Sequence, residues 1–585
     1  MSRGAFLFGT ILSAMVVIRS AWLLLSPFHW DEFHFLALVY DGSRGTIVSP
    51  LQTFHSQLFA WIPNLSTSLV PRIGGSPEEA GIVLGRTVML LCSLVSLVLL
   101  FSVAKRLYSP AVSIACCAMY CSLSHVLEHG ASFRYDPLVT LGFMLCWWLL
   151  TLRRSVLGPW LAGALFVVMV LVSLKALVLV PTLLLLCLSW RYQLPGRVAG
   201  RECGWRDAVA VAGGCGLAFL LIALLFAAPI LARSPLELGA RVAAVGQGFL
   251  LSSGPFVRGA VLVESIVENP LQWVAMGVGC YLMVRAMLVG GRDDADRAWM
   301  LLPCALLLLV PLIYRNAFSY FMPLLLIAPI LLAGLAFEWV ELRLPQRSSG
   351  IVALFSVVAV GTSWTFYLTQ RSNWRSVRQS QEQLLVSVHR LFPHSVSYID
   401  RGGMIASFPQ RGIFMSSWVM ARYHREGVNK LQSIYEDHPS PLLIVNHEAL
   451  DIRRSYERTT PTDRPENNGR DSVRPPLFES DWRFLRENFV SYSGAVFVAG
   501  RRLAGGALSG VLPIAIGGRY ALIEGEALLL EGERWEKGES RELSAGRYFV
   551  FADQDDGSSV SERVIRMVPP GGESIEIPGG PLFWR

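Results

Sequence analysis

The sequence predicts a mainly α-helical polytopic membrane domain, followed by an extracytoplasmic α/β domain and a small β-rich domain. Of the 585 residues, 53% are hydrophobic and 16% are charged, whereas a soluble domain carries about 25% charged residues. Apolar runs of roughly 16–25 residues recur up to about residue 370, and runs of that length can cross a bilayer. From Arg371 onward the chain is charged and rich in turn residues. The expected domains are therefore 1–370, 371–505 and 506–585.

About eleven membrane spans are expected. The first covers residues 5–25, and we interpret it as a retained span because no small-residue cleavage site separates it from the acidic stretch that follows. The remaining spans are 82–104, 111–127, 137–152, 157–174, 176–190, 208–232, 270–289, 298–313, 322–340 and 350–369.

Basic residues indicate how these spans are oriented. Alternate connections carry them close to the span ends, at Lys105–Arg106, Arg153–Arg154, Arg191 to Arg206, Arg292 to Arg297 and Arg343 to Arg347. Short basic connections of this kind face the cytoplasm. The other connections and the C-terminal part are then expected in the periplasm or outside the cell, with the chain in a bacterial inner (plasma) membrane. The net charge of +7 reflects these topology signals, so no nucleic-acid partner is expected.

The C-terminal part first alternates strands and helices. The segments "VSYID", "PLLIVN" and "AVFVAG" are expected strands, with helices between them in "SSWVMARYHREGVNKLQSIYED" and "FESDWRFLRENFV". This order predicts a small, mainly parallel α/β layer. Beyond residue 505, short apolar segments separated by glycines predict a β-sandwich or meander, with turns at Gly525, Gly532, Gly538 and Asp556–Gly557.

Polar residues concentrate in the outer connections. They are Asp31 and Glu32 in "HWDEFH", Arg134 and Asp136 in "FRYDP", Lys175 in "LVSLKALVLVP", and Arg315 and Tyr320 in "YRNAFSYFMP". Charged side chains at membrane depth are costly, so they face cavities and work in pairs. We therefore expect one polar, water-filled pocket at the outer surface.

Simpler interpretations exist for each group. A single arginine or lysine at a helix end extends towards lipid headgroups, and Asp31 and Glu32 suit the first turn of a helix as capping residues. On a helix, Asp31 would share a face with His34, and His29 with Glu32, which is a pattern that holds a divalent metal. No HExxH or CxxC motif accompanies it. A divalent metal is thus the one cofactor that the sequence leaves open.

The ordered set of outer-face residues resembles the GT-C superfamily of polytopic glycosyltransferases, especially the bacterial branch similar to protein O-mannosyltransferases and lipid A aminoarabinose transferases. These proteins carry an acidic pair in the first external loop, matched by Asp31–Glu32, and a later acidic position, matched by Asp136. The segments around Lys175 and Tyr320 match two further family segments. Aminoarabinose transferases have Asp-Glu-x-Arg where this chain has His34.

The resemblance implies that a sugar moves from a polyprenyl-phosphate donor in the bilayer to a hydroxyl of a glycan, lipid or protein acceptor, with inversion at the anomeric carbon. A carboxylate would take the acceptor proton, and fixed cations would stabilise the leaving phosphate. The expected catalytic residues are Asp31, as general base, with Glu32 and Asp136. The expected donor-phosphate ligands are Arg134, Lys175, Arg315 and Tyr320, and His34 and His55 are expected on the acceptor side.

Other functions remain open from the sequence. A lipid-linked glycan flippase or transporter would show polar residues deep in the spans and internal repeats, and no clear repeat is present. A glycan polymerase or ligase would use a similar basic outer pocket. A non-catalytic assembly protein fits if the acidic pair only caps a helix.

Overall fold

The computed structural model describes residues 25–45, 54–73, 75–152, 157–189, 204–225, 259–314, 317–343, 348–453, 477–503, 509–525, 527–552, 563–571, 577 and 582–583. The chain divides into two compact units. The first, here the helical unit, comprises Met1–Ser26, Gly42–Ala60 and Val83–Ser372. The second, here the α/β unit, comprises Pro27–Asp41, Trp61–Ile82 and Asn373–Arg585. Two pieces of the first outer connection therefore belong to the same unit as the C-terminal part.

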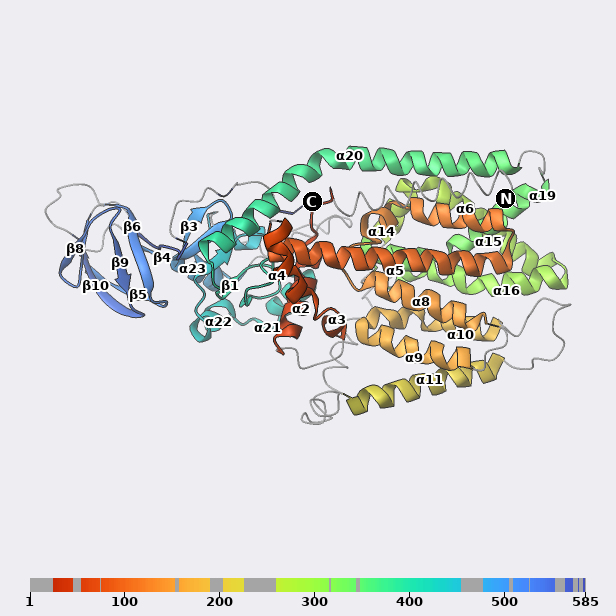
Figure 1. Ribbon diagram of the computed structural model, residues 1–585, viewed down its shortest axis with the longest axis horizontal. Coiled ribbons are helices and arrows are strands. Elements are labelled where there is room, and N and C mark those ends of the chain that lie inside the picture. Colours follow the sequence, from red (N-terminus) through yellow and green to blue (C-terminus); the bar gives the residue numbers. More distant parts are fainter. Residues whose placement is uncertain are drawn as a thin grey trace. The chain divides into compact units, whose positions relative to one another are not determined.

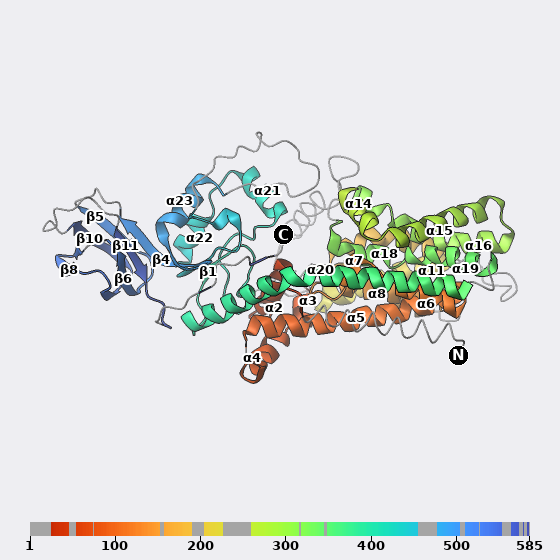
Figure 2. The same cartoon turned by 90° about the horizontal axis from the view of Figure 1, so that it is seen from above.

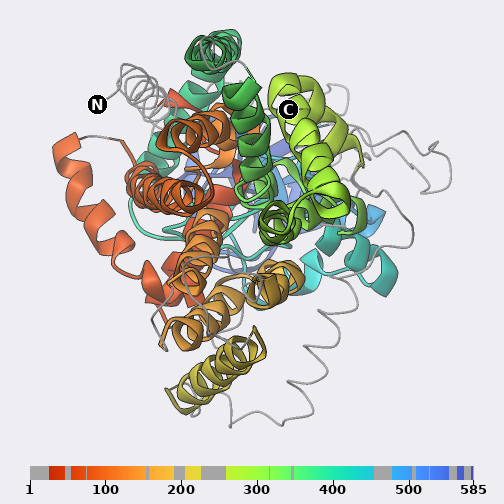
Figure 3. The ribbon, with the colours of Figure 1, turned by 90° about the vertical axis from the view of Figure 1, so that its right-hand side faces the viewer.

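Most described helices of the helical unit run along a common direction and are seen nearly end-on in Figure 3. The described helices of this unit are α3 (Phe54–Leu58), most of α5 (Pro77–Leu107), α6 (Pro110–Ser122), α7 (Ser124–His129), α8 (Asp136–Leu150), α9 (Leu157–Val172), η1 (Leu174–Leu179), α10 (Val180–Ser189), α11 (Gly204–Leu225), α14 (Gly259–Glu268), α15 (Pro270–Val289), α16 (Arg292–Leu307), α17 (Val310–Ile313), η2 (Ser319–Phe321), α18 (Met322–Leu326), α19 (Ile330–Arg343) and the first part of α20 (Ser348–Leu391).

The chain is a membrane protein with several candidate spans. In its described part, three helices are long and apolar enough to cross a bilayer: Pro77–Leu107, Pro270–Val289 and Asp294–Ile313. The pair Ser319–Leu326 and Ile330–Arg343, bent by 52°, would form a fourth. Further apolar helices are 10–17 residues long. The expected first span, 5–25, lies outside the described residues, and the total of eleven stays a prediction.

Several expected spans are interrupted. Leu123 is extended between α6 and α7, and η1 separates α9 from α10. A third break lies between α18 and α19, where Pro329 follows two turn residues. Irregular backbone at membrane depth occurs where protein or a water-filled cavity surrounds it. One of these breaks, η1, contains the polar residue Lys175 described below.

Small residues let the helices of this unit approach closely. A Cβ atom on Gly163 of α9 would lie 2.0 Å from the carbonyl oxygen of Val211 on α11, so only glycine fits there. By contrast, Leu91, Val95 and Val98 form one exposed apolar face of α5. That spacing places all three on the same side of the helix, as expected for a surface in contact with lipid.

The α/β unit combines helices with two sheets (Figures 1 and 2). Its helices are α2 (Trp30–Ser43), α4 (Ile62–Ile73), the second part of α20, α21 (Ser417–Glu426), α22 (Leu431–Asp437), η3 (Glu448–Leu450) and α23 (Glu479–Asn488). Its strands are β1 (Tyr398–Ile399), β2 (Leu442–Ile444), β3 (Phe489–Ser493), β4 (Val496–Leu503), β5 (Ser509–Ile514), β6 (Gly518–Glu524), β7 (Leu528–Leu530), β8 (Glu533–Trp535), β9 (Ser540–Leu543), β10 (Gly546–Ala552) and β11 (Arg563–Met567).

The mainly parallel α/β layer expected from the sequence is wrong. Among the described strands, only β1 and β2 pair in parallel, whereas β4 runs antiparallel to both β2 and β3. The physical reason is a hairpin: "FVSYS" is strand β3, turning at Gly494, where φ is 54°. The sequence had placed the start of this segment at the end of a helix. Because β3 is an additional strand, β4 follows it in the opposite direction and is antiparallel to β2 as well.

Strand β4 joins the two halves of the C-terminal part. Its first half pairs with β2 and β3, and its second half pairs with β11, which continues to β6 and β9. The second sheet has the order β5-β10-β7-β8. Positive φ values at Gly525, Gly532 and Gly538 confirm the expected turns, while Asp556–Gly557 lies outside the described residues. The domain limits at 370 and 505 stay predictions.

A buried carboxylate organises the helices beside the first sheet. Asp481, in the first turn of α23, accepts hydrogen bonds from the Tyr423 hydroxyl at 2.7 Å and from the backbone N–H groups of Lys430, Leu431 and Gln432. It therefore caps the N-terminus of α22, which leaves such N–H groups without partners inside the helix. The Tyr423 oxygen also accepts the Phe478 N–H at 2.9 Å. These contacts connect α21, α22 and α23.

Candidate functional site

A cluster of charged side chains is buried in the helical unit where α8 begins. Asp136 starts this helix, and its carboxylate lies between two cations: Arg134 Nε is 3.2 Å from Oδ2, and Lys175 Nζ is 3.3 Å from Oδ1. Each of the three residues is about 4% exposed. Pro137 follows Asp136 and suits the first turn of a helix because its missing N–H is not needed there. The local sequence thus fixes the carboxylate at the helix start.

Lys175 reaches the cluster from the break between α9 and α10. It lies in η1, and the Ser173 side chain accepts the backbone N–H of Lys175 at 3.3 Å. The short 3-10 segment interrupts the apolar run, so a cation is presented between the two spans expected at 157–174 and 176–190. A lysine at this depth requires a partner, and Asp136 supplies it.

Aromatic rings line the cationic side of this cluster. The Tyr320 ring, in η2, lies 3.5 Å from Arg134 Cζ and 4.4 Å from Lys175 Nζ, measured to the ring centroid. The Tyr135 ring is 4.8 Å from the same lysine nitrogen. Cations above aromatic faces are stabilised by the ring quadrupole. One ring therefore holds both cations in place without neutralising them.

Two cations lie close together in this cluster because each contacts the same carboxylate. Buried charges are costly unless they are paired, and Asp136 supplies a partner to both. Guanidinium and ammonium groups both bind phosphate oxygens.

Four of the residues selected from the sequence are thus adjacent in the structure, namely Arg134, Asp136, Lys175 and Tyr320. Arg315 lies outside the described residues. His55 lies in α3 of the helical unit. His129 contacts the Tyr320 ring edge-on, with centroids 6.3 Å apart.

The acidic motif belongs to the α/β unit, in the first turn of α2. Glu32 is fully buried, and its Oε2 accepts the backbone N–H of His29 at 2.9 Å. This is the reciprocal contact of a helix capping box, which was the simpler interpretation of the pair. Asp31 differs, because its side chain is 14% exposed and lies 3.6 Å from His29 Nδ1. The catalytic role expected for Glu32 stays a prediction.

Long-range contacts hold this motif in the α/β unit. The Gln381 side chain, from α20, accepts the Phe28 N–H and donates to the Phe28 carbonyl, both at 2.8 Å. Its amide nitrogen also donates to the Leu582 carbonyl at 2.7 Å. The guanidinium of Arg378 lies 3.6 Å from the Phe28 ring centroid. Chain segments from three distant parts of the sequence therefore converge just before α2.

His34, expected on the acceptor side, stacks on an aromatic ring of the C-terminal part. Its ring lies 3.9 Å from that of Phe414, with an interplanar angle of 19°. In the part of the chain that the structure describes, no three His, Cys, Asp or Glu side chains converge as metal ligands. A metal held by the acidic motif stays an open alternative.

Sequence reasoning missed one cation beside the acidic motif. The Arg401 guanidinium lies 4.5 Å from the Trp30 ring centroid, and Trp30 directly precedes Asp31. The only sequence signal was an arginine immediately after a short strand, in "YIDRGG". Nothing in that pattern pairs it with a residue 371 positions earlier.

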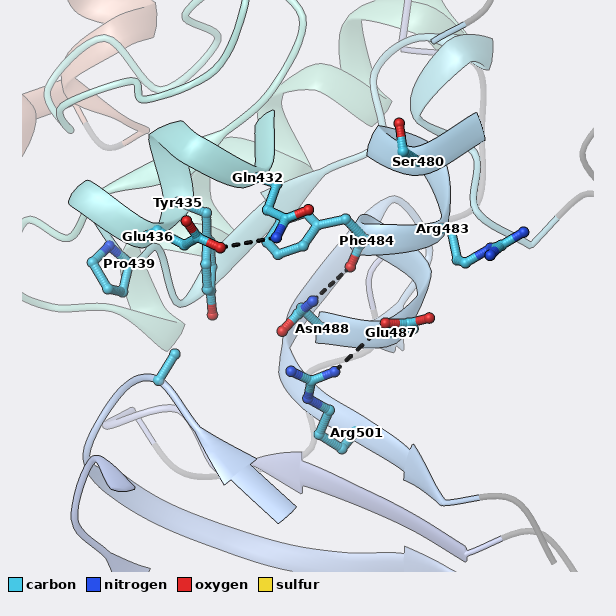
Figure 4. Close-up of a pocket in the computed structure, with 11 residues that line it drawn as sticks. Gln432, Tyr435, Glu436, Pro439, Ser480, Arg483, Phe484, Glu487, Asn488 and Arg501 are labelled. Carbon is cyan, nitrogen blue, oxygen red and sulfur yellow. Dashed lines mark hydrogen bonds and ion pairs between the residues drawn. The ribbon is translucent and has the colours of Figure 1, made fainter. Parts of the chain in front are cut away.

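A separate polar cavity of about 610 Å³ lies among α22, α23 and β4 (Figure 4). Its lining groups contact one another: Arg501 Nη1 lies 4.0 Å from Glu487 Oε2, and Gln432 donates to Glu436 at 2.9 Å. Asn488 donates to the Phe484 carbonyl at 2.7 Å. The cavity contains none of the residues expected to act on substrate.

Comparisons with known proteins give the following matches. The chain is similar to the crystal structure of ArnT from Cupriavidus metallidurans bound to undecaprenyl phosphate, with 12% identity, a TM-score of 0.49, and coverage of 74% of this chain and 92% of that one. It is also similar to the archaeal oligosaccharyltransferase AglB from Archaeoglobus fulgidus, with 10% identity, a TM-score of 0.49 and 97% coverage of both chains. No protein-family model matches the sequence, and no curated protein matches it significantly.

Proposed function

We propose that this chain is a membrane glycosyltransferase that moves a sugar from a polyprenyl-phosphate donor to an acceptor hydroxyl. The observation that carries the proposal is the Arg134–Asp136–Lys175 cluster, in which two buried cations share one carboxylate. Two cations held together inside an apolar helical unit fit the phosphate of a lipid that lies in the same bilayer. A site for a soluble anion would not need to be buried in such a unit.

The proposed reaction is a direct displacement. The acceptor oxygen forms a bond to the anomeric carbon while the bond from that carbon to the phosphate oxygen breaks, and the electron pair leaves with the phosphate. Asp31 takes the hydroxyl proton as general base. Arg134 and Lys175 stabilise the charge that develops on the phosphate. Attack opposite the leaving group inverts the anomeric centre.

Asp136 and Tyr320 have positioning roles in this mechanism. The carboxylate holds both cations by short contacts, and the ring supports their other face, so neither cation must reorganise when the phosphate leaves. Arg315 would add a third phosphate ligand, and His34 and His55 would line the acceptor side. Glu32 keeps the start of α2 in place, so that Asp31 is presented beside it.

The experiment replaces Asp31 in cells. A strain that lacks the gene is complemented with wild type or with Asp31→Asn, and its envelope glycans, glycolipids and glycoproteins are compared by mass spectrometry. Loss of one sugar, together with accumulation of its lipid-linked donor, is expected in both the deletion strain and the Asp31→Asn strain. Normal glycosylation with Asp31→Asn protein present at wild-type level would remove Asp31 from this role. Donor accumulating only on the cytoplasmic face would instead identify a flippase.

We also propose that the α/β unit faces the periplasm or cell exterior. The sequence has no cysteine after Cys304, so a cysteine introduced at the exposed Ser433 would report on this unit alone. A membrane-impermeant maleimide should label Ser433→Cys protein in intact cells with a permeable outer envelope. Labelling only after lysis would place the unit in the cytoplasm, and wild type provides the background.

A further inference from the structure

Arg401 is a buried cation for which the described part of the chain shows no anionic partner. The residue is 8% exposed, and its Nε is fully buried without a hydrogen-bond partner. Within the described residues its side chain makes no ion pair, and its only assigned contact is with the face of the Trp30 ring. The buried Nε–H has lost the water that would solvate it, and a buried guanidinium without an anionic partner indicates that a ligand is missing.

The loop that carries Arg401 is rigidly built. The buried Asp400 carboxylate accepts the backbone N–H groups of Gly402, Gly403 and Met404 at 2.8–3.0 Å. The Asn446 side chain donates to the same carboxylate at 2.9 Å and accepts the Arg401 N–H at 2.9 Å. Because every one of these contacts involves buried groups, the arginine backbone is held before any ligand arrives.

This loop also approaches α2 closely. Gly403 has a φ of 84°, and a Cβ atom there would lie 2.8 Å from Cβ of Ala37 on α2. A side chain at this position would clash and would be strained, so glycine is required for both reasons. The short approach places the loop against the helix that presents Asp31.

An aromatic ring contacts the guanidinium. Trp30 lies beside Arg401, and the centroid of its ring is 5.7 Å from that of Phe414. Stacking on a ring uses one face of the planar guanidinium and leaves its N–H edge available for two parallel hydrogen bonds. Phosphate and carboxylate groups match that edge.

We propose that Arg401 binds an anionic group, a phosphate or a carboxylate, of the acceptor substrate. The inference rests on the proposed function, in which Asp31 takes the proton of the acceptor hydroxyl. Arg401 contacts Trp30, which immediately precedes Asp31, so an anion bound here belongs to the molecule that Asp31 deprotonates. The donor phosphate already has its cations in the Arg134–Asp136–Lys175 cluster. The acceptor is thus an acidic glycan, lipid or protein, and the C-terminal part helps to select it.

The test compares Arg401→Gln with Arg411→Gln in the purified full-length protein. Arg411 lies in the same region, is exposed, and loses the same charge. Inorganic phosphate serves as the acceptor-side probe and a long-chain polyprenyl phosphate as the donor-side probe, and each is scored by the rise in melting temperature. Phosphate also stabilises proteins by exclusion from their surface, and the difference between the two variants removes that contribution.

The rise in melting temperature caused by phosphate should be about half as large, or smaller, in Arg401→Gln as in Arg411→Gln. Loss of the binding site removes the stabilisation that phosphate binding provides. Arg401→Lys, which keeps the charge, should recover part of it. The rise in melting temperature caused by polyprenyl phosphate should be equal in Arg401→Gln, Arg401→Lys and Arg411→Gln. Equal phosphate responses would overturn the site, and a smaller polyprenyl-phosphate response in Arg401→Gln would overturn its assignment to the acceptor. None of these measurements depends on sugar transfer. The proposed function fails separately, if the wild-type protein transfers no sugar.

Discussion

Lys175 Nζ lies 3.3 Å from Asp136 Oδ1, although the two residues come from different helices and are 39 positions apart. Arg134 occupies the other oxygen of the same carboxylate. The single aspartate therefore contacts two buried cations, and its removal affects both of them. This dependence gives the first prediction.

Asp136→Asn should destabilise the protein by about 3–5 kcal/mol, because removing one partner of a buried ion pair leaves unpaired charge in an apolar environment. The melting temperature in detergent measures the effect, and sugar transfer should be lost as well. The double variant Asp136→Asn/Lys175→Met removes one of the orphaned cations and should recover part of the stability but none of the transfer. The single variant Lys175→Met is measured as well. If the loss of stability in the double variant equalled the sum of the losses in the two single variants, the coupling between these residues would be refuted.

Replacing Tyr320 separates its ring from its hydroxyl. Tyr320→Phe keeps an aromatic face below Arg134 and Lys175, so near-normal donor binding is expected. Tyr320→Leu removes the cation–π contacts, which are worth about 0.5–2 kcal/mol, and should raise the donor KM by about 2- to 30-fold. The acceptor KM should not change. A large loss in Tyr320→Phe would show instead that the hydroxyl contacts substrate.

Glu32 can be tested for capping against catalysis. Glu32→Gln keeps an oxygen that accepts the His29 N–H, so stability and most of the transfer activity should be retained. Glu32→Ala loses this contact and should cost about 0.5–2 kcal/mol, with transfer falling in parallel. Complete loss of transfer in Glu32→Gln at an unchanged melting temperature would restore the direct catalytic role that the sequence predicted.

The ion pair between His389 and Glu78 predicts how stability depends on pH. Burial disfavours the charged imidazole, but the Glu78 carboxylate, 2.8 Å away, outweighs it and raises the pKa of His389 above its ordinary value. The pair should therefore stabilise the fold fully below about pH 6.5, the usual histidine pKa, and this contribution should be lost as the pH rises through the folded-state pKa.

The measurement compares the melting temperature of wild type with that of His389→Gln, from below pH 6.5 to above the folded-state pKa of His389. The glutamine side chain of the variant does not titrate, so the stability advantage of wild type should shrink as the pH rises. Phe408 packs edge-on against the histidine ring, and Ser407 donates to the same carboxylate, so other contacts remain in both proteins. Parallel curves would contradict a charged His389.

The sequence could identify the charged cluster because burying charge in a membrane is costly wherever it occurs. Arg134, Asp136 and Lys175 stood out against apolar surroundings, and a shared pocket was the economical explanation. Contacts that depend only on tertiary packing left no such trace. Gln381 is one polar residue among many in a charged stretch, and its amide pairs with Phe28 only because the fold brings together positions 353 residues apart.

Local ambiguity explains the error in the sheet. The run "RFLRENFVSYSGAVFV" contains a helix, a strand, a turn and a second strand within a few residues. Its first apolar residues fit either period, and assigning them to the helix hid the hairpin. Arg401 was missed for a different reason, because an arginine after a strand is ordinary until its buried position is known.

The Asp481 network has an implication for how this protein can vary between species. One carboxylate accepts the Tyr423 hydroxyl of α21 and the first backbone N–H groups of α22. An asparagine at this position would offer a single accepting oxygen in place of two, so the same set of hydrogen bonds could not be completed. Related chains are therefore expected to keep an acidic residue here, while exposed positions of the same helices vary.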